Sequence, residues 1–100
     1  MASTKEYRDY ILEQLGVAGF SDVRSRPMMG EYLLYIDETL IGGIYDDRLL
    51  LKKVPGSEEF GMEEALPYDG AVKKMWLVSE VDDRKKLEEI IQQTIDGLAT

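Results

Sequence analysis

The sequence contains no cysteine and no histidine among its 100 residues. Without thiols or imidazoles, the chain has no cysteine nucleophile, no histidine general base and no sulfur or nitrogen ligands for a zinc site. Disulfide bonds are excluded as well, so the stability of the fold has to come from a hydrophobic core. We therefore expect no cofactor and no metal centre, and we predict that the protein is not an enzyme.

Positive charge is also scarce in this chain. Twelve Lys and Arg residues stand against twenty Asp and Glu residues, which gives a net charge of -8. Such a field repels phosphate backbones and anionic lipid, so direct nucleic-acid binding is unfavourable. No apolar run is long enough for a signal peptide or a membrane span. These features together favour a cytoplasmic protein that binds neither a membrane nor nucleic acid.

Hydrophobic residues make up 44% of the sequence and charged residues 32%, a balance typical of a globular chain. At this length we expect one domain, residues 1–100. A domain of this size leaves much of its surface in water, so its stability is marginal. A homodimer would bury more apolar surface, and we expect self-association alongside a protein partner that the sequence does not name.

The first helix is predicted from its capping residues. Ser3 and Glu6 match a capping box, which places a helix start near Thr4. Apolar residues then recur at helical spacing until Gly16, a residue typical of helix ends. The helix should pack one face on the rest of the domain.

The last helix shows the clearest periodicity in the chain. Asp82 or Asp83 can cap it, and its outer face is charged. Its apolar stripe consists of Leu87, Ile90, Ile91, Thr94, Ile95 and Leu98. We expect this stripe to cover a sheet of the same chain.

Between the helices the hydrophobic period changes to two or to short apolar runs, which predicts strands. The candidate strands are residues 23–28, 32–36, 40–45, 48–53 and 74–79. The breaks between the first four strands suit tight hairpins, while Pro55 and Gly56 stop pairing and leave at most a short helical turn after them. The prediction is a two-layer α+β fold, an antiparallel β-sheet meander flanked by N- and C-terminal helices.

Four residues are assigned structural roles in turns: Gly30, Gly43, Asp46 and Asp47. Asp46 and Asp47 could instead form a paired-carboxylate site for a hard cation. Successive turn residues usually point apart, and Asp bonds its own backbone in turns, so the structural interpretation is favoured. Gly43 lies inside a predicted strand, where glycine typically marks a bulge or a close approach of a helix to the sheet.

Two stretches carry a specific resemblance: residues 26–37, RPMMGEYLLYID, and residues 40–52, LIGGIYDDRLLLK. They resemble the TfoX N-terminal domain family, in which a Met-Phe-Gly-Gly turn precedes a Gly-Leu-Tyr strand and a later Asp-Asp-Arg-Leu-Tyr-Leu-Lys segment. The similarity continues through Pro67 and Tyr68 to the last helix. The resemblance implies a secretion-chaperone-like α+β fold and a bacterial role in competence or transcription regulation. Because the chain ends at Thr100, after the last helix, we expect a stand-alone N-terminal domain.

The leading hypothesis is a small non-enzymatic protein that regulates through protein contacts. The residues assigned to its candidate partner-binding surface are Met28, Met29, Tyr32, Tyr35 and Arg48. A second interpretation groups aromatic residues with nearby cations into a stacking surface for single-stranded nucleic acid, namely Tyr32, Tyr35, Tyr45, Tyr68 and Trp76 with Arg24, Arg26, Lys52 and Lys53. Core packing of these rings and the acidic balance oppose it.

The alternative function from another class is a small-ligand-binding or carboxylate-based catalytic domain with a cleft at the sheet edge. A deep pocket with converging charged groups would favour that alternative. A shallow apolar patch would favour partner binding.

Overall fold

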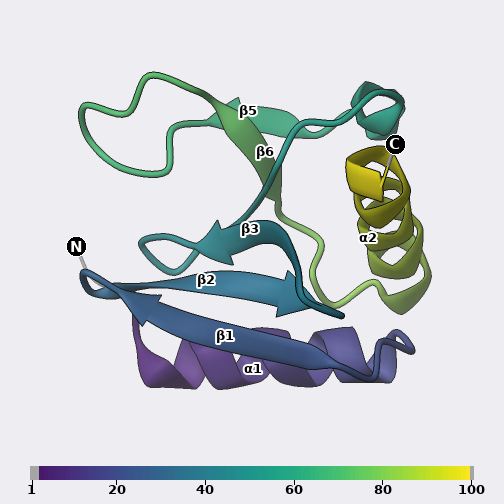
Figure 1. Cartoon of the computed structure of the whole chain (residues 1–100), viewed down its shortest axis with the longest axis horizontal. Helices are drawn as coiled ribbons and strands as arrows, with labels where there is room; N and C mark the ends of the chain where they lie inside the picture. The colour runs from purple at the N-terminus through teal and green to yellow at the C-terminus, as the bar shows by residue number, and fades with distance from the viewer. Residues whose placement is uncertain (1–2, 100) are drawn as a thin grey trace.

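The computed structural model describes residues 3–99 and places an antiparallel six-stranded sheet beside two helices (Figure 1). This α+β architecture confirms the fold class expected from the sequence. The elements are α1 (Lys5–Val17), β1 (Val23–Met28), β2 (Glu31–Ile36), β3 (Thr39–Ile44), β4 (Leu49–Leu51), the 3-10 turn η1 (Ser57–Phe60), β5 (Glu63–Ala65), β6 (Met75–Val78) and α2 (Arg84–Ala99).

Three two-residue turns connect the first four strands as a meander. They are Met29-Gly30, Asp37-Glu38 and Asp46-Asp47, and all six residues have positive φ, between 50° and 87°. A turn with positive φ at both central residues matches the right-handed twist of the flanking strands, which favours tight hairpins. Gly30, Asp46 and Asp47 each occupy a central position of one of these turns.

The outer part of the sheet differs from the prediction. The strand order is β1-β2-β3-β4-β6-β5, so β6 pairs with β4 and an additional strand, β5, forms the edge. β5 holds only three residues, two of them the weak strand formers Glu63 and Glu64, and sequence periodicity does not detect it. Its pairing with β6, in which Glu64 lies opposite Trp76, creates the strand.

The start of α1 corrects one detail of the capping prediction. Thr4, rather than Ser3, is the N-cap, and its Oγ1 accepts a hydrogen bond of 3.1 Å from the Tyr7 amide. The Ser3 hydroxyl donates instead to Glu31 on β2, at 2.6 Å. The start of α2 follows the prediction, because Asp83 Oδ1 accepts from the Lys86 amide at 3.2 Å.

Both helices contribute to one hydrophobic core. Ile11 and Leu15 of α1 and Leu87, Ile90 and Ile91 of α2 belong to the same buried cluster as alternate residues of β2 and β4. The stripe of the last helix therefore covers the sheet of its own chain, as expected. Within residues 3–99, neither helix has the length and hydropathy needed to cross a bilayer.

Gly43 lies inside β3 and not in a turn, which corrects its grouping with the turn residues. A Cβ at this position would lie 2.7 Å from the carbonyl oxygen of Tyr32 and 2.7 Å from Cε2 of Tyr45. The nearest atoms belong to the Tyr45 ring and to a neighbouring strand, and not to a helix as the sequence had led us to expect. Glycine is required here because the Tyr45 ring occupies the space of a side chain.

Candidate functional site

A polar network ties the N-terminal segment to two hairpin turns. Oε1 of Glu31 accepts hydrogen bonds from the Ser3 amide at 3.0 Å and from the Asp46 amide at 3.1 Å. Oδ1 of Asp47 accepts from the Thr4 amide at 2.8 Å. Residues 3–99 contain no group of three acidic side chains placed to hold a metal ion. The Asp47 carboxylate thus has a structural partner, which is consistent with the structural interpretation of the Asp pair.

The structure separates the residues assigned to the candidate partner-binding surface. Met28 and Met29 lie at the tip of the β1–β2 hairpin and are 37% and 98% exposed. Tyr35 is half-buried and pairs with Arg24 across β1 and β2. Tyr32 lies in the core, beneath the guanidinium of Arg8. Its assignment to the partner-binding surface was therefore wrong. Alternation along β2 explains the split, since residues 32 and 35 face opposite sides of the sheet.

Arg48 acts as a tether between two parts of the sheet. Its Nε donates to the carbonyl of Tyr45 at 3.1 Å, and its Nη2 donates to the carbonyl of Leu66 at 3.1 Å. The second bond holds the loop between β5 and β6 against the β3–β4 turn. The Arg48 guanidinium is therefore committed to backbone carbonyls of its own chain.

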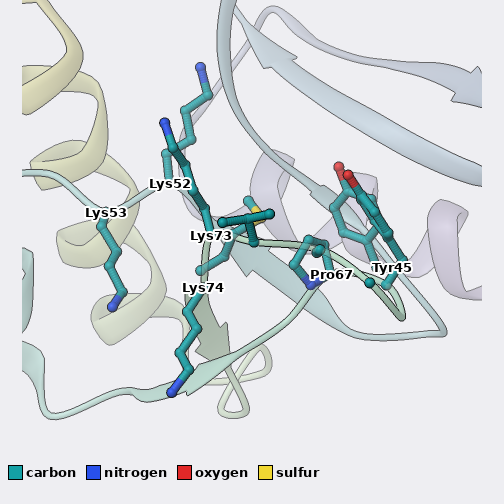
Figure 2. Close-up of a pocket in the computed structure, with 11 residues that line it drawn as sticks. Tyr45, Lys52, Lys53, Pro67, Lys73 and Lys74 are labelled. Atoms are coloured by element: carbon teal, nitrogen blue, oxygen red, sulfur yellow. The ribbon is translucent and has the colours of Figure 1, made fainter.

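A broad pocket of about 950 Å³ opens beside this loop (Figure 2). The sequence did not predict this pocket, although some of the tyrosines and lysines that line it belong to the hypothetical stacking surface described above. Among the residues that the structure describes, no Asp or Glu contributes to its lining, which consists of Tyr45, Lys52, Lys53, Pro67, Tyr68, Gly70, Ala71, Val72, Lys73, Lys74 and Met75. The pocket lining is therefore positively charged, whereas the protein as a whole has a net charge of -8.

Sheet pairing brings the four lysines together. Lys52 and Lys53 directly follow β4, and Lys73 and Lys74 directly precede β6. β4 and β6 are antiparallel neighbours in which Leu51 pairs with Trp76, so the end of one strand lies beside the start of the other. Two lysine doublets that are twenty residues apart in the sequence therefore line the same pocket.

The aromatic side of the pocket has a separate origin. Tyr45 follows β3 and is 6% exposed, while Tyr68 lies in the β5–β6 loop and is 58% exposed. Their ring centroids are 6.5 Å apart at an interplanar angle of 48°. Burial raises the pKa of the Tyr45 phenol, with smaller contributions from Tyr68 and Glu31, so Tyr45 is neutral at physiological pH.

The four lysines differ in their electrostatic partners. Lys53 forms an ion pair with Glu64, and its Nζ lies 4.6 Å from the centroid of the Trp76 ring. The ion pairs among residues 3–99 involve none of Lys52, Lys73 and Lys74. Three of the four lysines that line the pocket thus form no ion pair with the described residues.

The sequence contained one signal for this site. Lysine doublets stand at the end of one predicted strand and at the start of another, in an otherwise acidic chain. Their meeting depends on the pairing of β4 with β6, which hydrophobic periodicity does not specify.

The fold defines a small α+β domain with one antiparallel sheet and two helices in a common core. The TfoX N-terminal domain family matches residues 15–98, and the chain belongs to that family. This match confirms the resemblance drawn from residues 26–37 and 40–52. The chain is also similar to a Spirochaeta aurantia protein described as an uncharacterized 12.7 kDa protein in the trpE 5' region, with 33% identity over 101 residues that span 98% of this chain and 85% of the relative.

Proposed function

We propose that this member of the TfoX N-terminal domain family is a non-enzymatic regulatory domain that acts through protein contacts in competence or transcription control in the cytoplasm. Family membership supports a regulatory role. The observation that carries the proposal is the exposure of Met29, which is 98% accessible at the tip of the β1–β2 hairpin. Methionine is a flexible apolar side chain that suits adaptable protein contacts.

The backbone beneath Met29 is held in place. The carbonyl of Gly30 accepts a hydrogen bond of 3.1 Å from the Ser3 amide, and Glu31 bonds the same residue through its carboxylate. Met28, 37% exposed, adds apolar surface next to Met29. A tip anchored to the N-terminal segment loses little conformational entropy when a partner covers it, which favours binding.

Two features of the titratable groups support a binding role over proton transfer. Burial raises the pKa values of Tyr7 and Tyr45, so both phenols are poor general bases near neutral pH. Glu31 and Asp47 use their carboxylates in the network that anchors the N-terminal segment. These carboxylates therefore hold in place the backbone from which Met29 projects.

A complementation experiment tests this proposal. A strain that lacks the gene is complemented with the wild-type chain, with Met29→Glu or with Val17→Glu, a matched change at a 54% exposed apolar residue of α1. We expect the wild type and Val17→Glu to restore the transcript levels altered by the deletion, and Met29→Glu to fail despite a native circular dichroism spectrum. Full restoration by Met29→Glu would contradict the proposal, as would a deletion that leaves transcripts unchanged.

A further inference from the structure

We propose that the pocket between Tyr45 and the two lysine doublets binds a small phosphorylated ligand of the nucleotide class. This inference goes beyond the proposed function, because it adds a ligand site on a surface that does not include the Met28–Met29 tip. The pocket would make the domain responsive to a metabolite as well as to a protein partner.

The local charge of the pocket favours an anionic ligand. The protein has twelve Lys and Arg residues, and four of them line one pocket that no Asp or Glu lines. Lys52, Lys73 and Lys74 form no ion pair with residues 3–99. Neighbouring like charges repel one another, and a bound polyanion would convert that repulsion into attraction. Phosphate groups form strong charge-assisted hydrogen bonds with lysine ammonium groups.

Two of the lysine side chains point in the same direction. Figure 2 shows the ammonium ends of Lys52 and Lys73 reaching to the same side of the pocket, the side toward which the Tyr45 hydroxyl also points. Pro67 lies between the lysines and the Tyr45 ring in this view. Lys74 and Lys53 point the other way. Lys52 and Lys73 are therefore the two cations best placed to hold a phosphate chain together.

An exposed aromatic ring lines the other side of the pocket. Tyr68 is 58% exposed and packs beside the Tyr45 ring, which leaves much of the Tyr68 ring accessible from the pocket. A planar base can stack on such a ring, whichever base it is. A ligand with a base at one end and phosphates at the other matches the two sides of the pocket.

Pocket size and net charge favour a small ligand over a nucleic-acid strand. The volume of about 950 Å³ lies within the range that small molecules occupy, roughly 300–1,000 Å³. A strand that continued beyond the pocket would meet the field of a protein with net charge -8. A compact polyphosphate avoids that repulsion because all of its negative charge lies close to the lysines of the pocket.

Calorimetry on the full chain tests the proposal, with ATP, inorganic triphosphate and adenosine as probes at low salt in the presence of EDTA. We expect saturable binding of ATP, weaker binding of triphosphate and still weaker binding of adenosine. The double variant Lys52→Glu/Lys73→Glu should weaken ATP binding by about tenfold or more. The control Arg84→Glu/Lys85→Glu, an equal change of charge on exposed residues of α2, should leave the affinity within about twofold.

A third variant separates the base from the phosphates. Tyr68→Ala should reduce ATP affinity to that of triphosphate and leave triphosphate binding unchanged. The substituted side chains are exposed or half-buried, so we expect each variant to keep its fold. Circular dichroism on each variant checks this.

Three results would overturn the proposal. They are the absence of saturable binding of both ATP and triphosphate at millimolar concentration, equal weakening by the two double variants, and tighter binding of a single-stranded oligonucleotide than of ATP. None of these results bears on Met29, so failure here is distinguishable from failure of the proposed function.

Discussion

Oε1 of Glu31 lies 2.6 Å from the hydroxyl Oγ of Ser3 and accepts its hydrogen bond, which joins the N-terminal segment to β2. The same oxygen accepts from the Ser3 and Asp46 amides, so one carboxylate satisfies donors from two segments that are more than forty residues apart. This contact explains why Ser3 does not cap α1, and it gives the hairpin tips a common anchor.

Substitution of Glu31 should therefore destabilise the domain. Glu31→Ala removes the acceptor of the Ser3 hydroxyl and of the Asp46 amide, while the Ser3 amide keeps the Gly30 carbonyl, and the free energy of unfolding should fall by about 1–3 kcal/mol. Urea unfolding followed by circular dichroism measures the change. The control Glu89→Ala, on the exposed face of α2, should alter stability by less than about 0.5 kcal/mol. Equal effects from the two variants would argue against the anchoring role.

Two glycine substitutions should have opposite effects. Gly43→Ala places a Cβ 2.7 Å from both Tyr32 O and Tyr45 Cε2, and we expect a loss of about 1–3 kcal/mol. Gly16→Ala in α1 meets nothing within 4 Å and should raise stability by up to about 1 kcal/mol. Thermal denaturation of both variants checks the prediction. A stable Gly43→Ala variant would show that both the Tyr45 ring and the β2 backbone at Tyr32 can shift to admit a methyl group.

The apolar stripe of α2 gives a prediction about folding. Ile91 is 0% exposed, and Ile91→Asp places an unpaired charge in the core, which should cost several kcal/mol and unfold the chain. The neighbouring change Gln92→Asp, on the exposed face, should leave the spectrum native. Circular dichroism and light scattering distinguish the outcomes. A native spectrum with halved mass for Ile91→Asp would instead indicate that the stripe forms a homodimer contact.

Alkaline pH should destabilise the domain through its buried tyrosines. Burial raises the pKa values of Tyr7 and Tyr45 above the ordinary value of about 10, because it disfavours the phenolate. A pKa raised in the folded state contributes stability that is complete below the unfolded pKa. That contribution is lost as the pH rises through the folded pKa. Tyrosinate absorbance should show late-titrating phenols, and Tyr45→Phe should remove one of them. An unchanged titration in Tyr45→Phe would contradict the assignment.

Local patterns predicted much of this fold correctly. Helical spacing located α2 and its capping Asp83, and a period of two located β1, β2, β3 and β6. Turn residues located three hairpins, because a two-residue loop between apolar runs leaves the chain few alternatives. These features were predictable because the interactions that create them join residues close together in the sequence.

The sequence by itself also determined the charge balance, the family and the exclusion of thiol and imidazole chemistry, since residue types decide these properties. Only the tertiary structure decided that Tyr32 is buried, that β5 forms at the sheet edge and that the lysine doublets share a pocket. The physical reason is long-range strand pairing. β4 and β6 are joined by a connection of more than twenty residues, and no local preference specifies which strand edge β6 will occupy.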